Sequence, residues 1–542
     1  MRPTPILEKI SEYLKHTVAG FHTPGHRQGE GCLPEFRQLM GGSALNMDLT
    51  EVPGLDNLKN PEGCLKESQA LAAKLYEAVA TFYLVNGSTA GLQAALLAVN
   101  SPGGKIFIPR HAHISVINGL ILSGGEPVLV PVELEKTWGF PLGVQPQVFR
   151  AYLAGKGTNK SGKKPEGLDE TEHSGGPAKP EAAGELKERR KTGIQENPGE
   201  QTAIEAALTV QPTYQGLGFD AAAIRQVFAA QGIVQIVDEA HGAHLFFQKR
   251  LPFSLQKEQA DLVIQSTHKT LAALTQASML HVNNPRLLEP VREALNILQT
   301  TSPSYLLMAS LDSVQAQMTE EGPRLVERAI ELAEQLRRQA AEIAGFQVFS
   351  RESLAAGQKE WLQDPTKVLV SAAPLGLTGW QLAELLQEKY GLVVEMADYY
   401  YVLFLVTIGH RREDIAQVVS ALQKISQSYR ANRPGGPCLP GGHSGLDSSG
   451  CRSKCPAVFY EQAVELAMTP RKVYYNRKEA VNLAEAVGRI SGAAPVVYPP
   501  GIPCLWPGQL IAKEHVEYLE WALQNNLQVQ GLTDQKKIVV CR

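Results

Sequence analysis

No run of about 18 or more apolar residues occurs in this chain of 542 residues, so the sequence predicts no membrane-spanning helix. The first residues, Met1 to Pro5, have no apolar core of the kind that a secretory signal needs, and a cytoplasmic protein is expected. The formal net charge is only −3, which provides neither a basic surface for nucleic acid nor an acidic tail.

Cysteine is scarce, with seven residues spread over the whole length, and this odd, thin distribution does not resemble a disulfide framework. Cys438, His443, Cys451 and Cys455 could be drawn as a zinc site, but their spacing is looser than that of zinc-binding motifs. We therefore expect reduced thiols and no metal.

Aromatic residues are almost absent from residues 155–201, a segment rich in Lys, Glu, Gly and Pro. Such a composition cannot bury enough surface to offset the entropy lost on ordering, so it predicts a disordered surface insert. Residues 432–456 are rich in Gly, Ser and Pro and predict a linker.

A chain of this length exceeds a single core, because cores stop growing at roughly 250 to 300 residues. Strands and helices alternate from residue 67 to residue 311, which is typical of an α/β protein with a mainly parallel sheet. The predicted parts are an amino-terminal arm at 1–47, a large domain at 48–322, a small α/β domain at 323–431, the linker, and a carboxy-terminal domain at 457–542.

Apolar periodicity predicts individual elements within these parts. A helix is expected over 67–80, because Leu71, Leu75 and Val79 form one apolar stripe. In the small domain, strands at Lys367–Ser371 and 392–395 are expected on either side of a helix at Gly379–Tyr390.

Lys269 is the most informative residue for chemistry. It follows a strand-like run at 261–265, and open α/β sheets bind ligands at the ends of their strands. Hydroxyl and imidazole neighbours, Ser266 and His268, make a Schiff-base role plausible. The alternative is a solvated loop cation.

Two further motifs precede Lys269. Asp238 closes a strand at 233–237, where a carboxylate could pair with a protonated pyridine nitrogen, cap a helix or bind a metal. Gly87, Ser88 and Thr89 lie between a predicted strand at 81–85 and a predicted helix at 89–99. Backbone amides and hydroxyls there could hold a phosphate, or they could simply cap the helix.

Several separated motifs carry a resemblance to a known family. They are residues 21–26 (FHTPGH), 48–51 (DLTE), 54–58 (GLDNL), 84–89 (LVNGST), 211–214 (QPTY), 237–244 (VDEAHGAH), 265–271 (QSTHKTL), 298–305 (LQTTSPSY) and 498–503 (YPPGIP). In these motifs the chain resembles the ornithine/lysine/arginine decarboxylase family of pyridoxal-phosphate enzymes, which have the aspartate-aminotransferase fold.

The resemblance implies a fold-type I large domain, a smaller α/β domain and a carboxy-terminal decarboxylase domain, without the receiver-like amino-terminal domain of longer relatives. It also implies at least a homodimer, with a cofactor pocket near the subunit interface and residues 23–26 reaching the neighbour. One position departs from the family pattern, because Gln509 stands where a glutamate is expected.

The resemblance also assigns roles to single residues. Lys269 would form the Schiff base with pyridoxal 5′-phosphate and return a proton to the product carbon. Asp238 would pair with the ring nitrogen, and Ala240 and His113 would cover the two ring faces. His241 would contact the ring oxygen or the substrate. The residues that would bind the phosphate are Gly87, Ser88, Thr89, Ser266 and His268.

The implied reaction is decarboxylation of arginine, lysine or ornithine to agmatine or a diamine and carbon dioxide. An aminotransferase or related lyase on the same fold, and a non-catalytic pyridoxal-binding regulator, are the alternatives. A basic substrate needs an acidic or polar group at the far end of its side chain. The candidates for this group are Asp48, Glu51, Asp56, Glu395 and Asp398.

Overall fold

The computed structural model of the chain describes residues 3–17, 19–154, 204–251, 253–431, 460–497 and 501–542. The predicted insert and the predicted linker lie outside these ranges, as do Cys438, His443, Cys451 and Cys455. Among the described residues, no group of three or more His, Cys, Asp or Glu side chains could hold a metal ion. No helix in the described ranges is long and apolar enough to cross a membrane.

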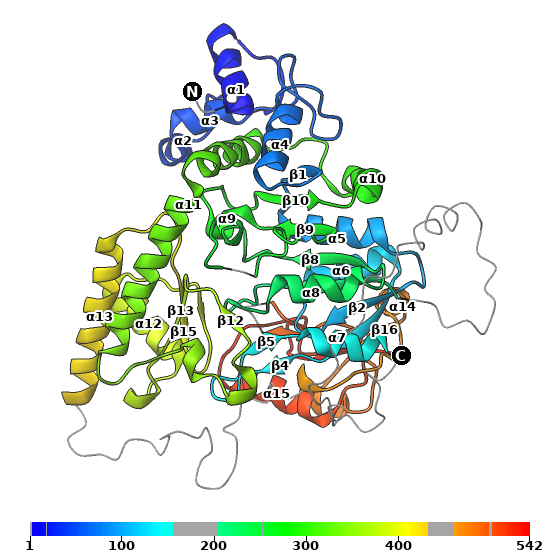
Figure 1. The fold of residues 1–542 in the computed structure, drawn as a ribbon, viewed down its shortest axis with the longest axis vertical. Coiled ribbons are helices and arrows are strands. Elements are labelled where there is room, and N and C mark those ends of the chain that lie inside the picture. Colours follow the sequence, from blue (N-terminus) through cyan, green and yellow to red (C-terminus); the bar gives the residue numbers. More distant parts are fainter. Residues whose placement is uncertain (1–2, 18, 155–203, 252, 432–459, 498–500) are drawn as a thin grey trace.

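A seven-stranded sheet forms the centre of the molecule (Figure 1). In spatial order its strands are β1 Ala80–Leu84, β10 Ser278–Val282, β9 Leu262–Gln265, β8 Val234–Asp238, β6 Ile204–Val210, β2 Lys105–Pro109 and β3 Glu126–Val130. The last five run parallel to one another, whereas β10 pairs antiparallel with β1 and β9. The predicted mainly parallel sheet is confirmed.

The sheet is buried on both faces, because successive strand residues point to opposite sides. Ile106 and Ile264 pack on one side against α5, α6 and α10, whereas Phe107 and Val263 pack on the other against α7 and α8. These helices are α5 Gly87–Val99, α6 Ile114–Ser123, α7 Pro146–Leu153, α8 Ala221–Ala229 and α10 Leu288–Leu298. Burial on both faces explains why the strands are nearly continuous apolar runs.

The helix predicted over 67–80 begins earlier and ends earlier than expected. Helix α4 spans Cys64–Leu75, and Glu77 follows it with a positive φ of 56°. Val79 is 50% exposed and does not belong to the apolar stripe. The helix ends at Leu75 because the chain must reverse direction before β1 begins, which periodicity alone does not reveal.

A second, smaller sheet is packed with three helices. Its strands are β11 Gln347–Val348, β13 Lys367–Ser371, β15 Val402–Leu405 and β14 Met396–Ala397, and the helices are α11 Tyr305–Ala341, α12 Gly379–Tyr390 and α13 Arg412–Ala431. The predicted strand Lys367–Ser371 and helix Gly379–Tyr390 are confirmed. The strand predicted at 392–395 is wrong, because only Met396 and Ala397 pair with β15, while Val393 is exposed.

Helix α11 connects the two sheets. It packs against α4 beside the large sheet and against α13 beside the small one (Figure 1). The domain boundary predicted between residues 322 and 323 lies inside this continuous helix. The division of the chain into domains stays a prediction.

The amino-terminal segment is attached to α11 by a buried carboxylate. It contains α1 Pro5–His16, α2 Pro34–Met40 and α3 Gly42–Met47. Asp312 of α11 accepts hydrogen bonds from the backbone amides of Ile6 and Leu7 at 3.0 and 3.1 Å. These bonds hold the first turn of α1, whose own amides have no partner within the helix.

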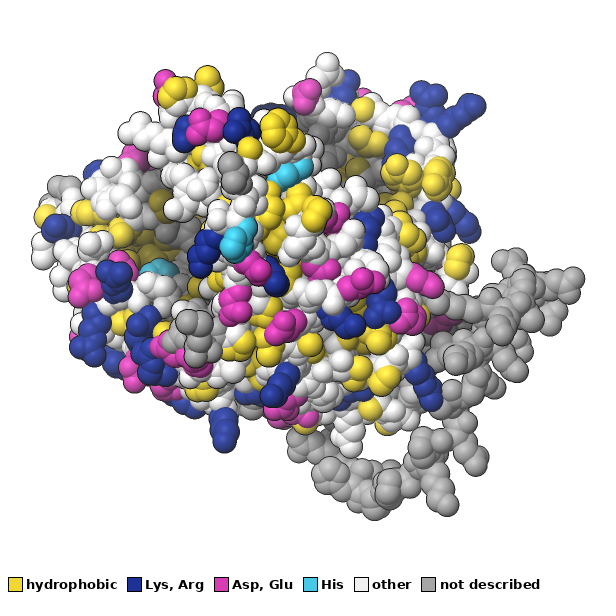
Figure 2. Space-filling view, turned by 90° about the horizontal axis from the view of Figure 1, so that it is seen from above, with side chains coloured by type: hydrophobic (Ala, Val, Ile, Leu, Met, Phe, Trp, Pro, Cys, Tyr) yellow, Lys and Arg dark blue, Asp and Glu magenta, His cyan; other side chains and the backbone are white. Residues whose placement is uncertain are grey.

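The carboxy-terminal part is built from short elements beside β3 and α6. They are α14 Pro470–Tyr475, β16 Lys478–Val481, β17 Val496–Val497, α15 Lys513–Gln524, β18 Val529–Gln530 and β19 Ile538–Cys541. Smaller strands elsewhere are β4 Glu133–Leu134, β5 Pro141–Gly143, β7 Leu217–Gly218 and β12 Leu362–Gln363. Basic and acidic side chains are interspersed over the face shown in Figure 2.

Candidate active site

The carboxyl ends of β8 and β9 bring two predicted groups together. Strand β8 ends at Asp238, and β9 leads through Ser266 into the short helix α9 Thr267–Thr270, which carries Lys269. The two strands are parallel neighbours with Asp238 opposite Ile264. Both side chains therefore lie at the sheet edge where α/β proteins bind ligands.

Lys269 is partly buried, and its Nζ lies 2.9 Å from Nε2 of His241. Burial lowers the pKa of Lys269 below its usual value, whereas the negative charges of Asp238 and Glu395 oppose this shift. A lowered pKa increases the fraction of free amine, which is the form that attacks an aldehyde.

Asp238 is a buried carboxylate close to His113 and Lys269. It is 5% exposed, and its Oδ1 accepts a hydrogen bond from the amide of Ala240 at 3.1 Å. Burial raises the pKa of Asp238, and the charges of His113 and Lys269 counteract the increase. A carboxylate buried to this degree is favoured by an adjacent cation, such as a protonated ring nitrogen.

His113 caps helix α6 and is oriented by its own helix. Its Nδ1 accepts from the amide of Ser115 at 3.2 Å and lies 2.9 Å from the hydroxyl of that residue. Burial lowers the pKa of His113, and the charges of Asp238 and Lys269 act on it in opposite directions. A neutral ring near both residues is consistent with the predicted stacking role, which stays a prediction.

The start of α5 provides hydroxyls and amides beside Ser266. Gly87 has a φ of +72°, a conformation that glycine adopts far more readily than other residues. The hydroxyl of Ser266 donates to that of Ser88 at 2.8 Å, and Thr89 is exposed on the same turn. Ser88 follows β1 and Ser266 follows β9, so the structure brings together two residues that were predicted to bind the phosphate.

His268, which was predicted to bind the phosphate, is hydrogen-bonded to the backbone through one ring nitrogen. Its Nδ1 lies 2.9 Å from the carbonyl oxygen of Ala277 and must donate to it, so the neutral ring has no proton on Nε2. Burial lowers the pKa of His268. The ring could donate to an anion through Nε2 only after gaining a proton.

These groups fit a phosphorylated aldehyde that has a basic ring nitrogen. Lys269 offers the amine, Asp238 the buried carboxylate, and Gly87, Ser88 and Ser266 the amides and hydroxyls for an anion. Ala240, which is 7% exposed, and His113 lie close to Asp238.

Of the five acidic candidates, Glu395 is the one whose charge acts on Lys269 and His268. Its Oε1 accepts a hydrogen bond from the hydroxyl of Tyr214 at 2.7 Å. The other four have local partners. Asp48 pairs with His26, and Glu51 accepts from the amide of Leu58. Asp398 accepts from the amide of Tyr399, and Asp56 accepts from several amides at and before the start of α4.

Asp56 has a structural role and is not retained as a substrate-binding candidate. Its two carboxylate oxygens accept from the amides of Asn57, Glu62, Gly63 and Leu65 at 2.8 to 3.0 Å. We expect Asp56→Ala to lower the free energy of unfolding by about 2 kcal/mol, because the amides would lose a charged acceptor. Denaturant unfolding would measure the change.

The exposed Asp534→Ala variant serves as the matched control for this experiment. An unfolding curve of Asp56→Ala that superimposes on that of the control would contradict the capping role.

Two residues near Lys269 were not predicted as site residues. Tyr214 places its ring 4.4 Å from that of His241, and Lys367 at the start of β13 places its Nζ 3.2 Å from Nδ1 of His241. Tyr214 could have been chosen, because it belongs to one of the family motifs. Lys367 gives no sequence signal, since a lysine at the start of a strand resembles a surface residue.

Gln509, the position that departs from the family pattern, has a structural role. Its Oε1 accepts from Nη1 of the buried Arg110 at 3.1 Å, and its Nε2 lies 3.2 Å from Nε2 of His515. Gln509 thus connects the end of β2 to the carboxy-terminal part.

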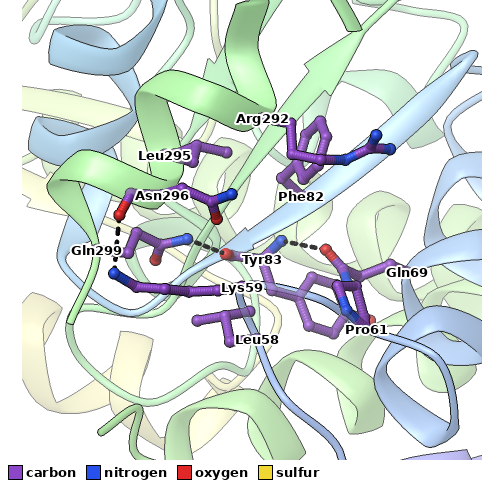
Figure 3. Close-up of a pocket in the computed structure, with 10 residues that line it drawn as sticks. All are labelled: Leu58, Lys59, Pro61, Gln69, Phe82, Tyr83, Arg292, Leu295, Asn296 and Gln299. Carbon is purple, nitrogen blue, oxygen red and sulfur yellow. Dashed lines mark hydrogen bonds between the residues drawn. The ribbon is translucent and has the colours of Figure 1, made fainter. Parts of the chain in front are cut away.

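A hollow between α10, β1 and the loop before α4 is separate from this site. Its lining includes Lys59, Tyr83 and Gln299, and it contains none of the predicted site residues (Figure 3). Lys59 donates to the carbonyl of Asn296 at 2.8 Å, and Gln299 donates to that of Tyr83 at 3.2 Å. These side chains are engaged in local hydrogen bonds.

Comparison with known proteins places the chain among decarboxylases. Residues 4–164 and 182–414 match the family described as Orn/Lys/Arg decarboxylase, major domain, and residues 453–536 match the C-terminal domain of that family. An arginine decarboxylase from Bacillus anthracis is 32% identical over 532 residues, which cover 98% of this chain and 95% of the relative.

Lysine decarboxylases are also similar, at greater distance. One from Pseudomonas aeruginosa is 26% identical over 96% of this chain and 76% of its own length. The solved structure of lysine decarboxylase A from Pseudomonas aeruginosa covers 99% of this chain and 80% of that chain, with a TM-score of 0.79 and 23% identity. This structural likeness establishes the fold.

Proposed function

We propose, from the premise that the chain belongs to the Orn/Lys/Arg decarboxylase family, that it removes the α-carboxylate of a basic amino acid with the help of pyridoxal 5′-phosphate. Family membership makes the chain a decarboxylase. The observation that supports the cofactor is the joint position of Lys269 and Asp238 at neighbouring strand ends.

The residues that would hold the cofactor are those already described. Lys269 would bind its aldehyde, Asp238 its ring nitrogen, and Ser88 and Ser266 its phosphate. When bound, the group supplies a conjugated ring that accepts the electron pair released as carbon dioxide leaves.

The chain's own residues would orient the substrate and move one proton. His113 and Ala240 would confine the two faces of the ring, so that the bond to the carboxylate is held in one orientation. Nζ of Lys269 would then deliver a proton to the product carbon.

Glu395 is proposed to bind the cationic end of the substrate side chain. It is an exposed carboxylate whose charge acts on Lys269, and the hydroxyl of Tyr214 orients it. A guanidinium can bond a carboxylate through two parallel N–H groups. Arginine is the first candidate substrate, because two relatives that are 32% identical over 98% of this chain are named arginine decarboxylases.

Glu395→Gln is expected to raise KM for arginine by about 10- to 100-fold, because a charged hydrogen bond contributes roughly 1.5–3 kcal/mol. The effect on kcat should be smaller, since the residue binds the unreacting end of the substrate. Initial rates against arginine concentration would measure both constants.

The exposed Glu388→Gln on α12 is the control for this substitution. An unchanged KM in Glu395→Gln would assign the recognition of the side chain to another residue.

The reaction itself is tested by measuring carbon dioxide release from arginine, lysine and ornithine. We expect stoichiometric release with at least one of them and no keto acid. Keto acid formation would support the aminotransferase alternative, and no turnover with any of the three would support a non-catalytic regulator.

We also infer that the chain forms a homodimer. The amino-terminal segment exposes large apolar side chains, with Phe21 99%, Leu33 74% and Leu39 87% exposed. Apolar surface of this kind is typical of interfaces. Light scattering that finds an active monomer would contradict this inference.

A further inference from the structure

Lys367 is a lysine buried inside the protein beside the proposed Schiff-base lysine. It opens β13, and its side chain has no exposed surface. The aliphatic part packs tightly against Gly216, where an added Cβ would lie 2.8 Å from Cδ of Lys367. Burying an ammonium without a close counter-charge is strongly unfavourable, so such a lysine requires an explanation.

The amine of Lys367 contacts the same imidazole as the amine of Lys269. His241 lies with Nε2 2.9 Å from Nζ of Lys269 and with Nδ1 3.2 Å from Nζ of Lys367. Among the described residues, no ion pair includes Lys367. His241 therefore lies between an amine from α9, which follows β9 of the large sheet, and an amine from β13 of the small sheet.

Hydrogen bonding limits which of Lys269, His241 and Lys367 can carry a proton. A neutral imidazole has one N–H donor and one bare nitrogen acceptor, whereas an ammonium can only donate. If both lysines were ammonium ions, the N–H of His241 would point at a group that cannot accept it. At least one of the two amines must therefore be uncharged for both contacts to be hydrogen bonds.

The surroundings indicate how the proton is distributed. Lys269 faces the carboxylates of Asp238 and Glu395, together with His113 and His268, whereas Lys367 faces Asp364 and Glu395. Asp364 is already paired with His244 at 3.0 Å.

The pKa directions agree with a shared proton. Burial lowers the pKa of Lys367 to about 8, with Asp364 and Glu395 opposing and Lys269 adding to the decrease. Burial, with the charges of both lysines, holds the pKa of His241 well below its usual value. A pKa of about 8 lets Lys367 gain or lose a proton near neutral pH. Since His241 is neutral and its two contacts require one uncharged amine, the carboxylates of Asp238 and Glu395 favour the ammonium on Lys269 and the free amine on Lys367.

We propose that Lys269, His241 and Lys367 form a proton relay in which Lys367 accepts the proton that Lys269 must lose to become a nucleophile. Nζ of Lys269 gives a proton to Nε2 of His241, while Nδ1 of His241 gives its proton to Nζ of Lys367. One ammonium, one amine and one neutral imidazole are present before and after the step. Lys367 is thus a positioning residue that acts through His241, and the inference rests on the proposed role of Lys269.

The test measures the amine of Lys269 in the full chain, stripped of any bound aldehyde with hydroxylamine. Trace acetylation with acetic anhydride at a series of pH values, followed by peptide mass spectrometry, gives the pH at which Lys269 is half-reactive. The variants are Lys367→Met, which is apolar and of similar length, and Lys367→Gln, which can hydrogen-bond to His241 but cannot accept a proton.

Both variants should raise the midpoint of Lys269 by about one pH unit, because the competing base that gains a positive charge is removed. The reactive fraction at neutral pH should then fall about tenfold, since one pH unit corresponds to a factor of ten. A midpoint that is unchanged or lowered in Lys367→Met would overturn the proposal. A wild-type midpoint in Lys367→Gln would also overturn it, because a hydrogen bond to His241, without acceptance of a proton, would then be enough to set the midpoint of Lys269.

Lys257→Met is the matched control, because Lys257 is another partly buried lysine with a lowered pKa, and its amine is bonded to the carbonyl of Gln248 and not to His241. It should leave the Lys269 midpoint unchanged. A second readout is the rate at which the stripped chain binds pyridoxal 5′-phosphate covalently. This rate should fall about tenfold at neutral pH in both Lys367 variants and recover when the pH is raised by about one unit.

The two proposals can fail separately. If pyridoxal 5′-phosphate never attaches to Lys269, the proposed function is wrong, but acetylation still reports whether Lys367 controls that amine. If attachment and turnover are normal while the Lys269 midpoint is the same in the Lys367 variants as in the wild type, only the relay is wrong.

Discussion

Lys269→Ala is expected to lower the turnover of the basic amino acid by at least about a thousandfold, because proton transfer by a positioned group alone contributes roughly 10²–10⁴-fold. The substitution removes the amine that would bind the aldehyde as well as the proton donor to the product carbon. Lys367, the other amine in contact with His241, does not replace it, since Lys367 is fully buried and contacts the opposite nitrogen of that imidazole. Carbon dioxide release under substrate saturation would measure the loss.

The control for this loss is Lys257→Ala, which removes a lysine that contacts the carbonyl of Gln248 and none of the predicted site residues. It should retain normal turnover. Activity of Lys269→Ala within a few-fold of the wild type would rule out Lys269 as the Schiff-base residue.

Asp238→Asn is expected to retain the cofactor but to lower kcat by about 100-fold, because it replaces a charge-assisted hydrogen bond to the ring nitrogen by a neutral one. The amide is nearly isosteric, and its oxygen can still accept from the amide of Ala240. The hydroxyls of Ser88 and Ser266 remain in place to hold the phosphate. Cofactor stoichiometry and kcat, measured on the same sample, would separate binding from chemistry.

The exposed Asp534→Asn variant is the control for Asp238→Asn and should behave as wild type. Full activity of Asp238→Asn would mean that the ring nitrogen needs no acidic partner. Complete loss of bound cofactor would instead give Asp238 a mainly structural role.

Much of the fold could be predicted because strong local patterns agreed with the tertiary structure. The strand Lys367–Ser371 and the helix Gly379–Tyr390 were predicted with their observed bounds. The errors lie where a reversal of the chain or the pairing of strands sets the bounds of an element. Helix α4 stops at Leu75, and residues 392–395 lie outside the β14–β15 ladder. Local periodicity contains no information about either event.

The site was partly predictable for a related reason. Asp238 and Lys269 both follow buried strands, and adjacent parallel strands bring their carboxyl ends together. Which ring nitrogen of His241 faces which amine depends on packing across two sheets. Lys367 is 126 positions from His241 in the chain, so only the folded structure could reveal that contact.

The substrate-binding carboxylate also required the structure. Asp56 and Glu395 were equivalent candidates in the sequence, and burial with local bonds distinguishes them. Asp56 accepts from four amides in the loop before α4 and in its first turn, whereas Glu395 is exposed beside the hydroxyl of Tyr214.

The central claim is that one lysine binds the aldehyde of pyridoxal 5′-phosphate. Borohydride reduction of the active holoenzyme, followed by peptide mapping, tests it most directly, because reduction fixes the cofactor to the lysine that holds it. The account predicts a single stoichiometric adduct on Lys269. An unmodified Lys269 in protein that is competent for turnover would contradict it.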